Sequence, residues 1–143
     1  MHMPLPWRRF SHQRPLKRVR TSVSPLADLK LQLRRIAELF ATRTGRGVVA
    51  MIAATQGETE LSKAFRHHFI LKSREQGREL LRRAIAAGEV RPDINEEAVL
   101  DLIYAPLYFR LLIGHGPLNA AFTDALLIES LRGFGALRHT ARE

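Results

Sequence analysis

The chain has 143 residues, of which 45% are hydrophobic and 26% are charged, and its formal net charge is +9. These proportions are typical of one globular domain and exclude a chain that is disordered throughout. The absence of cysteine excludes disulfide bonds and thiolate metal sites.

The N-terminal residues are strongly basic and contain no acidic side chain. Residues 1–22 carry six basic residues, namely Arg8, Arg9, Arg14, Lys17, Arg18 and Arg20. We expect residues 1–24 to form a disordered arm. A basic arm adds salt-dependent affinity for nucleic acid without reading sequence, so these six side chains are candidate phosphate contacts. The alternative is a solvated leader without a partner. Because this segment lacks the apolar core of a signal peptide, we expect a cytoplasmic protein.

Helical periodicity begins directly after this arm. Ser24 is a suitable N-cap and Pro25 is suited to the first helical position, so a helix is predicted over Pro25–Arg43. Apolar residues recur along it at helical spacing. The glycines in residues 44–47 predict a break, followed by a short, mostly apolar helix over Gly47–Gln56. A long helix is then predicted over Thr59–Ala87, with a bend near Lys72–Gly77.

The next helix differs from the others because it is apolar on all sides. Gly88 and Pro92 end the preceding helix, and Asn95 caps the new one, which runs to Ile113. A last helix is predicted over Asn119–Leu137. The sequence therefore predicts an all-α bundle of about five helices. The helix that ends at Ile113 is shorter than the usual span of about 20 apolar residues, so we expect no membrane segment. We expect a second copy of the chain to cover its outer side.

Three short motifs resemble one known family. The turn Gly88–Asp93, the segment Pro106–Leu112 and the segment Gly116–Leu118 are similar to the C-terminal effector-binding and dimerisation domain of TetR/AcrR-type transcriptional repressors. The similarity covers residues 25–137, and the whole of residues 25–143 is assigned to this domain. The resemblance implies a homodimer, a small and mostly apolar effector, no cofactor and no enzymatic activity.

The resemblance also suggests which residues form the sites. The helix from Pro25 matches the one that lines the effector pocket in the family, and the pocket candidates are Ile36, Phe40, Met51, Phe65, Phe69, Tyr104 and Tyr108. The family pairs its last two long helices with their symmetry mates, and the interface candidates are Ile103, Leu107, Arg110, Leu111, Leu127, Leu131 and Phe134. For Met51, Phe65 and Phe69, a plain core position is the alternative.

Three polar residues in the apolar helix have open alternatives. Tyr104 and Tyr108 are one turn apart and are favoured polar contacts for an effector, but internal hydrogen bonds or the dimer interface would also satisfy their hydroxyls. Arg110 needs a partner if it is buried. An interface ion pair with Asp124 or Glu129 is one explanation, and an anchor for an anionic ligand is another.

Other kinds of chemistry find little support in the sequence. His67 and His68 are adjacent, so they point about 100° apart on a helix and cannot share a metal ion; we expect them and His115 to be exposed. No nucleophile elbow or phosphate-binding glycine loop is present, so we expect no enzyme and no metal site. The residues before Pro25 show no helix-turn-helix pattern. DNA binding is therefore expected only through a head outside this sequence, or weakly through the arm. A stand-alone dimer that binds a ligand or pairs with a full-length regulator is the alternative function.

Overall fold

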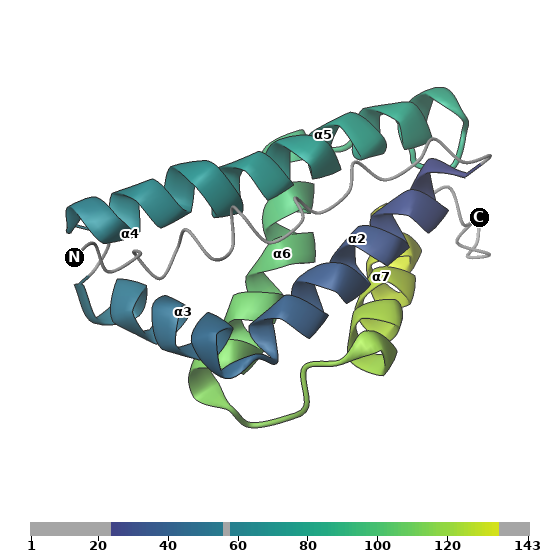
Figure 1. Ribbon diagram of the computed structural model, residues 1–143. Coiled ribbons are helices and arrows are strands. Elements are labelled where there is room, and N and C mark those ends of the chain that lie inside the picture. Colours follow the sequence, from purple (N-terminus) through teal and green to yellow (C-terminus); the bar gives the residue numbers. More distant parts are fainter. Residues whose placement is uncertain (1–23, 56–57, 135–143) are drawn as a thin grey trace.

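The computed structural model describes residues 24–55 and 58–134, and these residues fold as an all-α bundle (Figure 1). The six candidate phosphate contacts of the basic arm lie outside the described residues. The elements are α2 (Pro25–Phe40), α3 (Arg43–Thr55), α4 (Glu60–Phe65), the π-helix η1 (Arg66–Ile70), α5 (Leu71–Ala86), α6 (Glu96–Ile113) and α7 (Ala120–Phe134).

The predicted helix boundaries are confirmed where a side chain caps the helix. The backbone N–H of Ala27 donates to Ser24 Oγ over 3.2 Å, and that of Ala98 donates to Asn95 Oδ1 over 2.9 Å. At the end of α6, Gly114 adopts a φ of 70°, the left-handed conformation that glycine reaches without a steric penalty. These local signals depend on neighbouring residues alone, which is why the sequence shows them clearly.

The predicted break at residues 44–47 is wrong, because α3 begins at Arg43 and includes both glycines. The hydroxyl of Thr42 accepts a hydrogen bond from the backbone N–H of Gly45 over 3.0 Å and donates to the carbonyl of Leu39 over 2.7 Å. A Cβ at Gly45 would overlap the same Leu39 carbonyl. Gly45 therefore allows a close approach between α2 and α3, and it does not end a helix.

The long helix predicted over Thr59–Ala87 is present, but its irregularity lies at η1 and not at residues 72–77. In Figure 1, α4 and α5 appear as one long rod along the upper edge of the molecule. In η1 the hydrogen bonds follow the wider π pattern for one turn. Such single turns are rare and recur at functional sites. The turn brings Phe69 into the core.

The core lies between α2 and the helices around it. The helix α2 packs against α3, α5 and α7, while α6 packs against α3, α5 and α7. The fully buried side chains come from most of these helices and include Leu29, Leu33, Phe40, Phe65, Leu81, Leu100 and Leu107.

The apolar circumference of α6 is divided between two environments. Val99, Leu100, Ile103, Tyr104 and Leu107 are buried within the chain. Leu102, Phe109, Leu112 and Ile113 are instead 59%, 57%, 46% and 61% exposed. Within residues 24–55 and 58–134, no helix combines the length and hydropathy needed to cross a membrane.

Candidate functional site

The first half of α6 is attached to α5 by a network of ion pairs. Arg78 Nη1 donates to Glu96 Oε1 over 2.7 Å and to Glu97 Oε2 over 2.5 Å, while Arg82 Nε donates to Glu96 Oε2 over 2.7 Å. One turn earlier, Arg74 donates to Glu97 over 2.8 Å, and its other nitrogen donates to Asp101 over 2.6 Å. The network therefore fixes the N-terminus of α6 against the outer side of α5.

The network also changes the titration of its members. Hydrogen bonds from Arg82 and then from Arg78 lower the pKa of Glu96 to about 2. Hydrogen bonds from Arg74 and Arg78 lower the pKa of Glu97 as well. Both carboxylates lie in the first turn of α6, where the helix dipole also favours negative charge.

A buried polar contact joins α2, α5 and α6 just beyond these ion pairs. Tyr104 donates its hydroxyl proton to Gln32 Oε1 over 2.5 Å and lies 3.3 Å from the carbonyl oxygen of Ser73. Gln32 Nε2 donates to that same carbonyl over 2.9 Å. A Cβ at Gly77 would overlap the Tyr104 hydroxyl, so glycine allows α5 to approach the tyrosine closely. The Tyr104 hydroxyl is thus satisfied inside the protein, which was the alternative to a ligand contact.

Four of the predicted pocket residues form one aromatic cluster, which we define as Phe40, Phe65, Phe69 and Tyr108. The ring centroids of Phe65 and Phe69 are 5.2 Å apart in a stacked arrangement, and those of Phe40 and Phe69 are 5.9 Å apart. The Tyr108 ring lies 5.1 Å from that of Phe40. These distances are typical of interacting aromatic pairs. The cluster joins the C-terminal end of α2 to η1 and to the middle of α6.

The hydroxyl of Tyr108 differs from that of Tyr104. Tyr108 is partly buried, and its hydroxyl makes no hydrogen bond to any residue that the structure describes. Burial raises the pKa of Tyr108, so the phenol keeps its proton at neutral pH. The aromatic cluster therefore contains one donor that a bound molecule or a water could satisfy.

The two remaining pocket candidates, Ile36 and Met51, are not equivalent. Ile36 is 1% exposed and belongs to the same hydrophobic core as the aromatic rings. Met51 is only partly buried, on α3. A partly buried, flexible methionine is free to adapt its shape, whereas Ile36 is a fixed core position.

The interface prediction is wrong for three of its residues. Ile103, Leu107 and Leu127 are 1%, 0% and 4% exposed within a single chain, so their side chains cannot form the surface that meets a partner. Both faces of α6 are apolar, and periodicity could not show which one faces inward. Leu111 and Leu131 are partly buried against the core. Phe134 ends α7, and its side chain is not among those described.

Arg110 does not make the ion pairs suggested for it within the chain. Its guanidinium lies 3.8 Å from the centre of the Phe122 ring, and Nη1 donates to the carbonyl oxygen of Pro117 over 3.0 Å. Asp124 instead pairs with Arg34 of α2, and Glu129 pairs with Arg132. A Cβ at Gly116 would overlap the Arg110 side chain. Arg110 thus holds the loop between α6 and α7 in place.

An exposed apolar surface runs along the outer side of α6 and α7. We define this apolar surface as Leu102, Phe109, Leu112, Ile113 and Ile128, the last of which is 49% exposed. The ring of His115 lies 5.0 Å from that of Phe109 at the edge of this surface. Large exposed apolar patches mark interaction sites more often than ordinary solvent-facing surface does.

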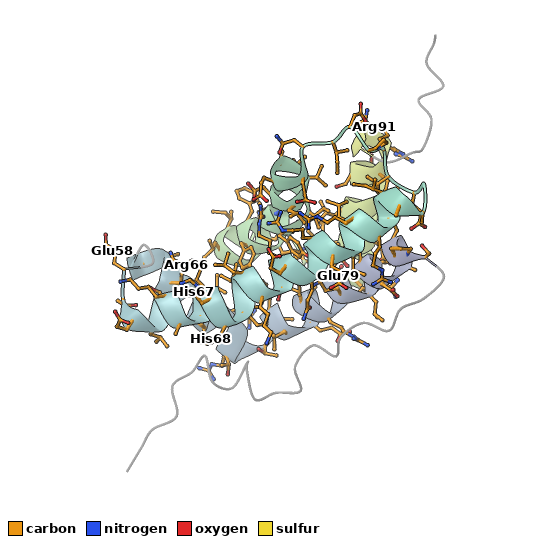
Figure 2. The ribbon with its side chains drawn as sticks, turned by 90° about the horizontal axis from the view of Figure 1, so that it is seen from above. Glu58, Arg66, His67, His68, Glu79 and Arg91 are labelled. Atoms are coloured by element: carbon orange, nitrogen blue, oxygen red, sulfur yellow. The ribbon has the colours of Figure 1, made fainter. Side chains whose placement is uncertain are left out.

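The described polar surface outside these regions consists mainly of paired charges and exposed histidines. An open hollow of about 560 Å³ along α5 is lined by paired, mixed charges such as Glu75, Arg78 and Arg82. His67 and His68 are exposed on η1, as predicted, and Figure 2 shows them at the opposite end of the long helix from Arg91. Within the residues described, no three His, Asp or Glu side chains are placed to hold a metal ion.

Comparison with known proteins decides the family. A family model described as the tetracyclin repressor-like C-terminal domain matches residues 22–129. The chain belongs to this family. It is a family of non-enzymatic regulators. A relative, the uncharacterized HTH-type transcriptional regulator YdeS of Bacillus subtilis (strain 168), is 29% identical over 117 residues. The match covers 82% of this chain and 59% of the length of YdeS.

Several residues that organise this tetracyclin repressor-like domain were not found by sequence reasoning. Gln32 accepts the hydrogen bond from Tyr104, and Gly77 lies close to the same hydroxyl. Arg34 joins α2 to α7 through Asp124. Glu89 accepts hydrogen bonds at the N-terminus of α2 from the Ser24 hydroxyl over 2.6 Å and from the backbone N–H of Leu26 over 3.2 Å. Each of these contacts joins residues that are far apart in the chain. One of these residues could have been noticed in the sequence. Gln32 is a polar residue on the apolar stripe of α2, which indicates a buried side chain that needs a hydrogen-bond partner.

Proposed function

We propose that this chain is the effector-sensing and dimerisation part of a TetR-type transcriptional repressor, and that it works as a homodimer. The exposed apolar surface on α6 and α7 carries the proposal. Five large apolar side chains that are about half exposed would be unfavourable on a monomer, and a twofold axis would bury the surface against itself. The family membership and the HTH-type relative support the regulatory role.

The aromatic cluster is the proposed effector site. It consists of apolar side chains with one hydroxyl that has no hydrogen-bond partner among the described residues, and small-molecule pockets usually combine apolar side chains with a few polar groups in this way. Met51 and the π-turn η1 give its edge two adaptable parts. We infer that a small, mostly apolar molecule binds there and stabilises one of two arrangements of the helices.

The helix α2 is the proposed route from the effector to DNA. Its last residue, Phe40, belongs to the aromatic cluster, and its middle joins the dimer helix α7 through Arg34 and Asp124. Its N-terminus is held by Glu89 in the turn before α6. A shift of α2 caused by the effector would therefore move the N-terminal end of α2, and a DNA-binding head that preceded it in a longer protein would move with it.

The dimer is tested by sedimentation equilibrium at micromolar concentration. We expect the wild-type chain to be a dimer, and Phe109→Glu to be a monomer that keeps its helical circular dichroism, because a charge in a buried apolar interface is strongly unfavourable. Leu31→Glu is the matched control, since Leu31 is an exposed leucine on α2, outside the apolar surface. A wild-type chain that is folded and monomeric at this concentration would contradict the proposal.

The effector role is tested by screening a library of small molecules for an increase in melting temperature. A ligand that binds only the folded state stabilises it by about 2.7 kcal/mol at 100 times its Kd. We expect saturable stabilisation by at least one apolar compound. A library in which no compound binds saturably would argue against effector sensing.

A further inference from the structure

The two tyrosines of α6 provide a way to narrow the chemical class of the effector. The hydroxyl proton of Tyr104 is donated to Gln32 Oε1, and the carbonyl oxygen of Ser73 lies 3.3 Å from the same hydroxyl. Tyr108, one turn later, presents a protonated hydroxyl beside the ring of Phe40 and has no hydrogen-bond partner among the described residues. Of the two tyrosines, Tyr108 is the one whose hydroxyl proton has no acceptor among the described residues.

The ion that acts on one of the tyrosines of α6 is already paired. Arg74, whose charge acts on Tyr104, is paired with Glu97 and Asp101. The cluster itself is made of phenyl rings and a phenol. A charged ligand placed there would lose its hydration without gaining a counterion, which is strongly unfavourable.

The geometry of the rings favours a flat molecule. Phe40 and Phe65 are fully buried and form the inner side, while Phe69 and Tyr108 are slightly more exposed and form the outer side. The rings of Phe69 and Tyr108 both contact Phe40. Phe69 stands on the π-turn η1, the irregular part of the long helix. An aromatic ring that enters from this side can replace ring–ring contacts with equivalent ones.

We propose that the effector is an uncharged aromatic molecule with one hydrogen-bonding group that pairs with the hydroxyl of Tyr108. This inference rests on the effector-sensing function proposed above. It assigns Tyr108 as the residue that determines specificity, and Tyr104 as a structural residue.

Four probes that share a methylphenyl ring test this class: p-cresol, toluene, p-toluate and 4-methylbenzylammonium. Each is titrated into the full chain, and binding is followed by NMR chemical shifts. We expect toluene and p-cresol to shift signals of the aromatic cluster, with p-cresol binding about threefold to tenfold more tightly, which corresponds to one neutral hydrogen bond. We expect the two charged probes to bind at least tenfold more weakly than p-cresol.

Two matched variants assign the hydrogen bond. In Tyr108→Phe, toluene and p-cresol should bind equally well, whereas Tyr104→Phe should keep the preference for p-cresol. The inference is overturned if the preference survives in Tyr108→Phe, or if either charged probe binds the cluster more tightly than p-cresol. It is also overturned if none of the four probes shifts the cluster signals.

The test separates this inference from the proposed function. If the probes fail while a compound of another class gives saturable stabilisation in the library screen, effector sensing stands and the aromatic class is wrong. If neither the probes nor any library compound binds, both proposals fail.

Discussion

The two halves of α6 differ in how they are held, although both are rich in apolar residues. The half from Glu96 to Tyr104 is attached to α5 by ion pairs and to α2 by a buried hydrogen bond. The half from residue 105 to Ile113 contains most of the exposed apolar surface. It also contains Tyr108, whose hydroxyl makes no hydrogen bond to a described residue. The fixed half supplies a reference position, and the second half supplies the surfaces that a ligand or a partner can use.

This division has a thermodynamic reason. A segment that binds an effector or a partner has polar groups and apolar surface that make no contacts in the free chain. These groups do not stabilise the free chain, so the segment is less stable than a fully packed one. The ion pairs and the Tyr104 contact compensate at the other end of the same helix. The second half of α6 can therefore carry binding sites while the first half keeps the helix in its orientation.

The largest expected effect compares the inner and outer faces of the second half. Leu107→Ala should lower the free energy of unfolding by about 2–5 kcal/mol, because Leu107 is fully buried. Leu112→Ala, at an exposed position, should change the stability of the single chain by less than about 0.5 kcal/mol. Urea denaturation of both variants in the monomeric Phe109→Glu background measures this without a contribution from dimerisation. Equal losses would show that α6 does not have two distinct faces.

The next effect concerns the close contact of the fixed half with α5. Gly77→Ala should be destabilising by about 1–3 kcal/mol, because the new Cβ would overlap the Tyr104 hydroxyl and its ring. This is the reverse of the usual gain of up to about 1 kcal/mol for replacing glycine by alanine within a helix. Chemical denaturation measures whether Gly77→Ala lowers or raises the free energy of unfolding. Gly133→Ala in α7 is the control, since a Cβ there meets no neighbouring atom.

An effect of similar size distinguishes the two tyrosines. Tyr104→Phe should cost about 1–3 kcal/mol, because it leaves Gln32 Oε1 buried without its donor. Tyr108→Phe should be neutral or slightly stabilising without ligand, since no hydrogen bond to a described residue is lost. Parallel melting curves of the two variants measure the difference. A larger loss for Tyr108→Phe would show that its hydroxyl already has a partner, and would weaken its assignment to the effector.

The sequence predicted the parts of this structure that depend on neighbouring residues. The caps at Ser24 and Asn95 and the apolar stripe of α2 were readable because each depends on residues within about one turn. The approach of Gly77 to Tyr104 and the link from Gln32 to Tyr104, 72 residues apart, depend on how helices pack. The same limit explains why the interface residues of α6 could not be identified from the sequence. A helix that is apolar on all sides has no polar side that would show which face turns inward.

The smallest effect is the dependence of stability on pH at the fixed end of α6. Glu96 has a pKa of about 2 in the folded chain, below its value of about 4.3 in an unfolded chain. Its contribution is therefore complete above about pH 4.3 and is lost as the pH falls toward 2. Glu96→Gln should flatten the decline of the melting temperature over this range, whereas Glu60→Gln, at an exposed site with a longer ion pair, should leave it unchanged. If the Glu96→Gln profile matched that of the wild type, the ion pairs would not be what holds the first half of α6, and the contrast between its halves would rest on Tyr104 alone.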